Sequence, residues 1–166
     1  GGVGLIKNYK KMITMDFKEI DNLVLVIGKT EGHIDQSLLA RTVLDENNGP
    51  PPEVNLFNEK NNGETLLQLI ENDFIKSAHD ISLGGIITAT SKMCIKGNKG
   101  INLKKPKFLI SEIEYFFGED QGRYIIEINT NNLKEVVKIL DKNSVHYDEL
   151  GVITDKFMII NEKTKV

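Results

Sequence analysis

Ser77-Ala78-His79-Asp80-Ile81-Ser82-Leu83-Gly84-Gly85 is the stretch that decides the predicted fold. An apolar pair at 74–75 leads into it and predicts a strand. Behind it, apolar residues at positions 86, 89, 93 and 94 recur with helical spacing, which predicts a helix over 86–95. The stretch is therefore expected to form a polar glycine turn between a strand and a helix.

This turn has two interpretations. The first N–H groups of a helix lack intrahelical partners and carry partial positive charge, which favours an anion. Gly84 and Gly85 would let a ligand approach the backbone closely, and Asp80 could cap the helix, hold a metal or orient a substrate. Alternatively, the paired glycines serve only tight packing. The sequence alone leaves both interpretations open.

The composition is typical of a folded domain and excludes several classes of function. The chain has 166 residues, of which 40% are apolar and 27% charged, so a packed core is expected. The net charge is −3 and no basic stripe is present, which argues against nucleic acid as a partner. No apolar run reaches the length of about 18 residues that a membrane span needs, so no membrane partner is expected.

Cys94 is the only cysteine. One cysteine cannot form an internal disulfide and fits a reducing compartment, so we expect a cytoplasmic protein. Cys94 lies on the apolar face of the predicted helix, which favours a small buried hydrophobe over a reactive thiol. Because the chain begins with glycine, we expect it to be a piece of a longer protein.

The pattern along the chain mixes strands and helices without regular alternation. This predicts an α+β fold in which helices pack on a mixed sheet. Residues 1–20 are expected to form an extended arm or edge strands. Strands are predicted at 23–27, 101–103, 124–128, 145–147, 150–154 and 157–160, and helices at 36–44, 55–72, 86–95, 112–117 and 132–142.

A second polar turn, Phe117-Gly118-Glu119-Asp120-Gln121-Gly122-Arg123, precedes the strand at 124–128. Its carboxylates could bind Mg²⁺, which prefers oxygen ligands, or they could simply be solvated. The three histidines show no metal-binding spacing and are expected to be surface or hydrogen-bonding residues. Ser82 does not lie in a nucleophile-elbow motif, and no Walker A or G-x-G-x-x-G motif is present.

Four stretches together resemble one family, the phosphoribosylformylglycinamidine synthases. They are Gly2-Val3-Gly4-Leu5-Ile6, Phe17-Lys18-Glu19, and the two turns quoted above. Their order and separation are similar to the last C-terminal domain of the synthetase component, in the aminoimidazole ribonucleotide synthetase superfamily. The resemblance covers essentially residues 1–166 as a single domain. It implies a partly ferredoxin-like α+β fold and an arm, 1–20, that joins an upstream ATP-binding domain.

The resemblance also implies a reaction. The family is a ligase of purine biosynthesis that converts formylglycinamide ribonucleotide to formylglycinamidine ribonucleotide with ATP, Mg²⁺ and glutamine-derived ammonia. Its partners are the upstream ATP-binding domains, a glutaminase subunit and a small accessory subunit. The family's catalytic histidines lie in parts that this chain lacks. We therefore expect no catalytic residues here and no activity from the isolated chain. A homodimer of the isolated chain is a further expectation.

Site residues follow from the same resemblance. A phosphate or nucleotide loop at a second, pseudo-symmetric site would involve His79, Asp80, Ser82, Gly84, Gly85 and Gln121, and Mg²⁺ would be held by Asp80 and Glu119. Leu83 stands where an acidic residue is common in the family, and Gly118 and Asp120 replace serines. Leu83 removes a carboxylate, which weakens the expected metal site, and Asp120 adds a carboxylate nearby without replacing it. A non-catalytic scaffold, a nucleotide-sensing module, or another superfamily member such as selenophosphate synthetase are the alternatives.

Overall fold

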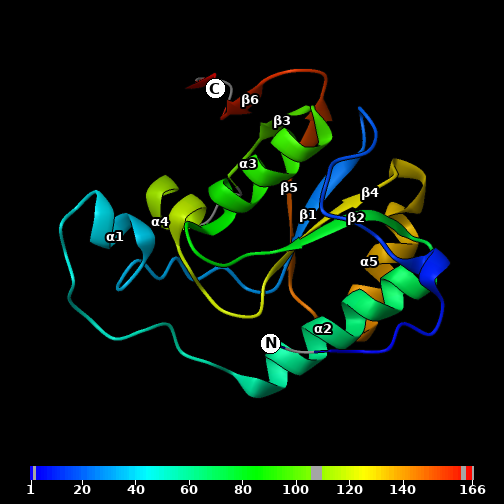
Figure 1. Ribbon diagram of the computed structural model, residues 1–166, viewed down its shortest axis with the longest axis horizontal. Helices are drawn as coiled ribbons and strands as arrows, with labels where there is room; N and C mark the ends of the chain where they lie inside the picture. Colours follow the sequence, from blue (N-terminus) through cyan, green and yellow to red (C-terminus); the bar gives the residue numbers. More distant parts are fainter. Residues whose placement is uncertain (2, 106–109, 162–163, 166) are drawn as a thin grey trace.

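A mixed sheet forms the centre of the computed structural model, which describes residues 1, 3–105, 110–161 and 164–165. In this part of the chain seven strands lie in the order β2-β4-β1-β5-β3-β6-β7 (Figure 1). The strands are β1 (Leu23–Ile27), β2 (Ile75–Asp80), β3 (Gly100–Leu103), β4 (Tyr124–Ile128), β5 (Tyr147–Thr154), β6 (Met158–Ile160) and β7 (Thr164–Lys165). The helices are α1 (Leu38–Thr42), α2 (Leu56–Glu71), α3 (Gly85–Gly97), α4 (Glu112–Phe117) and α5 (Leu133–Lys142), with 3-10 turns at Tyr9–Lys11 and Thr130–Asn132.

The core of this sheet is ferredoxin-like. The elements β1, α2, β2, β4, α5 and β5 follow one another as strand, helix, strand, strand, helix, strand. Their strands lie in the order β2-β4-β1-β5, and every neighbouring pair is antiparallel. The segment α3-β3-α4 is inserted between β2 and β4, and β3 pairs with the far side of β5. The predicted α+β class and its ferredoxin-like core are confirmed.

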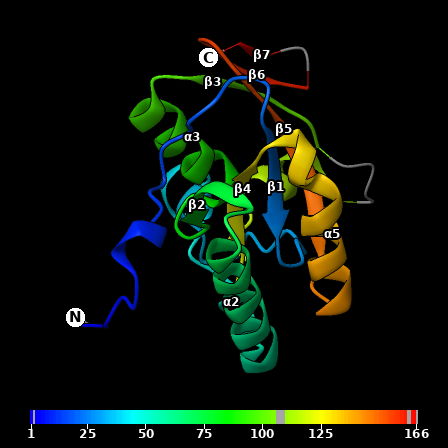
Figure 2. The ribbon, with the colours of Figure 1, turned by 90° about the vertical axis from the view of Figure 1, so that its right-hand side faces the viewer.

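Helices cover both faces of the sheet (Figures 1 and 2). Leu25 and Ile27 of β1 pack in one apolar cluster with residues of α2 and α5. Val24 and Val26 point to the other face and pack in a second cluster with residues of α3 and α4. A strand buried on both faces needs apolar residues at every position, because successive side chains alternate between the faces. This explains the unbroken apolar run at 23–27.

Most predicted elements are found close to their expected ends. The helix predicted at 55–72 is α2, capped by Asn55, whose side chain accepts the N–H of Asn58. The helix at 112–117 is α4, which begins with a capping box between Ser111 and Glu114. The helix at 36–44 is shorter than predicted. Phe108 and Leu109, the apolar residues that precede the helix at 112–117 in the sequence, lie outside the described residues.

Two predictions were wrong at element boundaries. The separate strands expected at 145–147 and 150–154 are one strand, β5, which begins at Tyr147. The acidic pair Asp148 and Glu149 interrupts the apolar pattern, although Asp148 is buried and only Glu149 is exposed. The strand expected at 74–75 extends through Asp80, so the turn that follows it is shorter than predicted.

A buried carboxylate fixes the segment before β1 to the centre of the sheet. Glu127 of β4 is fully buried. Its carboxylate accepts the backbone N–H of Lys18 at 2.8 Å and of Glu19 at 3.0 Å, the side-chain amide of Asn22 at 2.7 Å, and the hydroxyl of Ser77 at 2.8 Å. These four donors compensate the loss of water around the charge.

The arm runs beside the free edge of β2. Thr14 forms a parallel bridge with Ser77, and a short 3-10 turn at Tyr9–Lys11 precedes it. Among the described residues no helix has both the length and the apolar character needed to cross a membrane.

Candidate functional site

The glycine turn at the start of α3 is shaped by close packing. Gly84 and Gly85 both have positive φ, +82° and +67°. A Cβ added at Gly85 would lie within 2.8 Å of the backbone carbonyl oxygens of Phe116 and Gly118. Only glycine fits where α3 meets the end of α4, so the packing interpretation of this residue is sufficient on its own.

A side chain of the protein already occupies the anion position at this turn. Oε1 of Glu119 accepts the backbone N–H of Gly84 at 2.8 Å and that of Leu38 at 2.7 Å. Its own N–H donates to the carbonyl oxygen of His33 at 2.9 Å. Glu119 thus satisfies N–H groups at the starts of two helices, α3 and α1, where negative charge is favoured. A phosphate at this turn would have to displace it.

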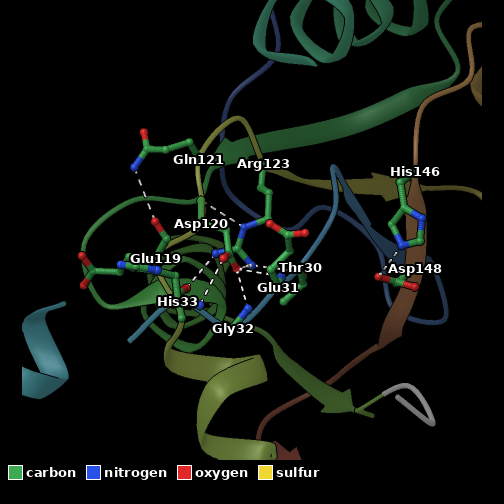
Figure 3. A network of polar contacts seen from close by, with 11 residues as sticks. Thr30, Glu31, Gly32, His33, Glu119, Asp120, Gln121, Arg123, His146 and Asp148 are labelled. Atoms are coloured by element: carbon green, nitrogen blue, oxygen red, sulfur yellow. Dashed lines mark hydrogen bonds and ion pairs between the residues drawn. The ribbon is translucent and has the colours of Figure 1, made fainter. Parts of the chain in front are cut away.

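The neighbouring carboxylate, Asp120, binds the loop that follows β1. Its Oδ2 accepts the N–H of Glu31 at 3.1 Å and of Gly32 at 3.0 Å, and its Oδ1 accepts the N–H of His33 at 3.1 Å (Figure 3). Three N–H groups directed at one carboxylate form a cradle of the kind that binds anions. Here the anion belongs to the protein itself.

Arg123 also belongs to this network. Its side chain is fully buried and donates to the carbonyl oxygens of Asp120 at 3.1 Å and Gly118 at 2.7 Å, and to the hydroxyl of Thr30 at 3.1 Å (Figure 3). Its Nη1 also lies 3.5 Å from Oδ2 of Asp120. Burial lowers the pKa of the guanidinium, and the charge of Asp120 opposes that shift.

A cleft of about 930 Å³ lies beside this network. Its walls come from the loop after β1, from the prolines at 50–52, from the first turns of α2, and from the α5–β5 connection. Gln121 lines it, whereas the other residues of the predicted site do not. The lining carries six carboxylates, those of Glu31, Asp35, Glu53, Glu59, Glu114 and Asp120, against the single lysine Lys29. Such a surface repels phosphate groups.

The residues predicted to hold a ligand or Mg²⁺ are only partly brought together. Nδ1 of His79 lies 3.0 Å from Oδ1 of Asp80, whose side chain is 64% exposed. Ser82 is exposed, and its carbonyl oxygen accepts the N–H of Gly85. In the described part of the chain no three His, Cys, Asp or Glu side chains gather as metal ligands. Oε1 of Glu119 already accepts two N–H groups, and a Mg²⁺ site at Asp80 and Glu119 stays a prediction.

Two further groups bear on the sequence predictions. Burial raises the pKa of the Cys94 thiol to about 12, as expected for an unreactive hydrophobe. His146 borders the cleft, and its Nε2 lies 3.4 Å from Oδ2 of the buried Asp148 (Figure 3). Burial raises the pKa of Asp148, and His146 partly offsets this.

The roles of Asp120 and Arg123 were missed by sequence reasoning. Their partners lie about 90 positions earlier in the chain, so local spacing carries no sign of the contact. The available signal was Asp120, which lies between Gly118 and Gly122, followed by Arg123 just before a buried strand.

Comparison with known proteins identifies the family. The family model for the C-terminal domain of AIR synthase related proteins matches residues 19–160. The chain belongs to this family. It is 69% identical over 166 residues to the phosphoribosylformylglycinamidine synthase subunit PurL of Pelagibacter ubique, and 36% identical over 164 residues to that of Azorhizobium caulinodans.

These matches include 100% and 98% of this chain. They cover only 23% and 22% of the relatives, so the chain spans about a fifth of their length. Solved structures of the Thermotoga maritima enzyme have the same fold. Phosphoribosylformylglycinamidine synthase II matches 95% of this chain and 27% of its own, with a TM-score of 0.75 and 18% identity. PurL complexed with ATP and the PurLQS structure each have a TM-score of 0.71, at 16% and 18% identity, over 95% of this chain and 26% of theirs.

Asp120→Asn is expected to lower the free energy of unfolding by about 3–5 kcal/mol, because it leaves the buried Arg123 without its counter-charge and weakens three N–H contacts. Urea denaturation measures this loss. Hydrogen exchange should increase first at residues 31–33. Asp141→Asn, at an exposed position on α5, is the control and should change stability by no more than about 0.5 kcal/mol. Unchanged exchange at 31–33 would contradict the assigned role.

Asp148→Asn is expected to stabilise the protein at neutral pH. The folded state raises the pKa of Asp148, so the wild type loses stability as the pH rises from the ordinary carboxyl value of about 4 through the folded value. The asparagine of the variant cannot ionise, so the variant does not lose this stability. Thermal unfolding as a function of pH should show a higher Tm for the variant at pH 7 and equal values in acid. Glu149→Gln, exposed on the same strand, should show no such dependence.

Proposed function

We propose that this chain is the C-terminal part of a phosphoribosylformylglycinamidine synthase, an ATP-dependent carbon–nitrogen ligase of purine biosynthesis in the cytoplasm. The observation that carries the proposal is the 69% identity to PurL over the full 166 residues. The whole enzyme would convert formylglycinamide ribonucleotide to formylglycinamidine ribonucleotide with ammonia from glutamine. ATP and Mg²⁺ would be its cofactors, in keeping with the Thermotoga PurL structure that contains ATP.

Within that enzyme, residues 1–20 would connect this domain to an upstream ATP-binding domain. The arm carries five large apolar side chains that are 63% exposed or more. Such side chains are suited to burial against another domain. They are Val3, Leu5, Ile6, Tyr9 and Met12. A glutaminase subunit and a small accessory subunit would complete the enzyme, and the PurLQS structure of Thermotoga supports an assembly of this kind.

The contribution of this domain would be structural rather than catalytic. The prediction that the glycine turn binds phosphate or nucleotide competes with the contacts of Glu119, which fills the anion position at Gly84. The acidic lining of the neighbouring cleft also disfavours a phosphate. We infer that the turn fixes α1, α3 and the loop after β1 relative to one another, and that the reacting groups lie elsewhere in the enzyme.

A chimeric enzyme tests the proposed function. The matching stretch of Pelagibacter PurL is replaced by these 166 residues, and formylglycinamidine ribonucleotide is measured with ATP, Mg²⁺ and ammonium. The chimera is expected to keep its activity within about tenfold of the host, because this stretch does not lower the chemical barrier directly.

The isolated chain is the matched control and should give no product under the same conditions. Turnover by the isolated chain would overturn the structural role. A folded chimera without activity, beside an active host enzyme, would overturn the proposed family function.

Calorimetry tests the turn itself. The folded wild-type chain is titrated with ATP and Mg²⁺, and separately with inorganic phosphate. We expect no binding heat, because Glu119 accepts the N–H of Gly84 and carboxylates line the neighbouring cleft. Asp80→Ala should behave identically. Saturable binding by the wild type that Asp80→Ala abolishes would instead establish the nucleotide loop.

A further inference from the structure

The chain contains two Asn-Gly pairs, Asn48–Gly49 and Asn62–Gly63. In such a pair the backbone nitrogen of glycine can attack the side-chain amide carbon of the asparagine, because glycine has no Cβ to obstruct the approach. The reaction requires that the two atoms reach each other and that neither is held in another contact. The structure places the two pairs in opposite environments.

Asn48 and Gly49 are open to this reaction. Both are exposed, in the irregular connection between α1 and α2. Gly49 has a φ of +82°, and within the described chain its N–H donates no hydrogen bond. The side chain of Asn48 likewise has no partner there. No hydrogen bond within the described chain therefore holds the amide of Asn48 or the nitrogen of Gly49, although the carboxylate of Asp35 lies close to Gly49.

Asn62 and Gly63 are closed to it. They lie inside α2, where the N–H of Gly63 is directed at the carbonyl oxygen four residues earlier. Asn62 is only 7% exposed, and its Nδ2 donates to the carbonyl oxygen of Gly122 at 2.9 Å. Both reacting groups are thus held apart by hydrogen bonds that unfolding alone would release.

We propose that Asn48 is a site of spontaneous deamidation in the folded protein. The nitrogen of Gly49 bonds to Cγ of Asn48, the bond from Cγ to the amide nitrogen breaks, and ammonia leaves with the proton from Gly49. Water then opens the resulting five-membered imide at either of its two carbonyl carbons. The products are aspartate and isoaspartate, and the net reaction consumes one water and releases one ammonia.

This change would lie next to Pro50, the first residue of this connection that lines the cleft. The new carboxylate joins the exposed acidic residues Asp45 and Glu46 of the same connection, so it adds repulsion. Isoaspartate also lengthens the backbone beside Gly49, whose carbonyl oxygen accepts Nε2 of Gln36 at 3.2 Å. The next carbonyl, that of Pro50, lies 3.0 Å from Nε2 of His33. These two contacts hold the connection against the loop after β1.

The test is incubation of the folded chain at mildly alkaline pH in water enriched with heavy oxygen, followed by mass spectrometry of its peptides. Labelled aspartate and isoaspartate should accumulate at Asn48 at least about tenfold faster than at Asn62. In urea the two sites should react at similar rates, since both pairs are then unstructured. Asn48→Gln should remove most of the product from that peptide and leave the Asn62 peptide unchanged.

Gly49→Ala is unsuitable as the control, because a Cβ there would collide with the carboxylate of Asp35 and would sit at a positive φ. Asn47, which precedes an asparagine in the same exposed connection, gives the background rate. Equal rates at Asn48 and Asn62 in the folded chain would overturn the proposal. So would a rate at Asn48 no higher than that at Asn47.

Discussion

The carboxylate of Asp120 is the constraint on which the arrangement around the cleft depends. It gathers three consecutive N–H groups, from Glu31 to His33, while Arg123 holds the turn behind it. A buried charge is tolerated only where its lost hydration is replaced, and here the backbone replaces it. The loop after β1 is therefore attached to the turn before β4 through Asp120, and Arg123 adds a contact to Thr30 of the same loop. The position of α1 and of the cleft wall follows from that attachment.

Glu119 extends the same principle to the helices. Where many proteins use the start of a helix after a glycine turn to bind a ligand anion, this chain places its own carboxylate there, between α3 and α1. The two adjacent acidic residues thus have separate tasks. Glu119 orders the helix starts, and Asp120 orders the loop. The sequence of the acidic turn suggested a metal site or a solvated surface. In the structure its two carboxylates accept backbone N–H groups of α1, of α3 and of the loop after β1.

Local features of the sequence predicted the elements well, because their causes are local. The unbroken run at β1, the capping residues Asn55 and Ser111, and the spacing in α5 each reflect forces within a few residues. The strand β5 was split in the prediction because Asp148, with Glu149, interrupts the apolar pattern. Its burial depends on packing from distant elements, which a local pattern does not record. The contacts of Glu119 and Asp120 span 35 to 89 positions and could not be predicted for the same reason.

The fold that the family resemblance implied is confirmed, whereas the ligand roles that it implied for the two turns stay a prediction. Gly85 is required by the approach of α4 to α3, whatever binds nearby, so it would persist in a domain copy that has no ligand. A phosphate site also needs N–H groups that no acceptor of the protein occupies, and a surrounding surface that is not strongly negative. In this chain Glu119 accepts the N–H of Gly84 at this turn, and six carboxylates line the neighbouring cleft. A glycine turn of this kind can therefore be common to a fold, whereas the charged side chains around it influence whether it binds phosphate.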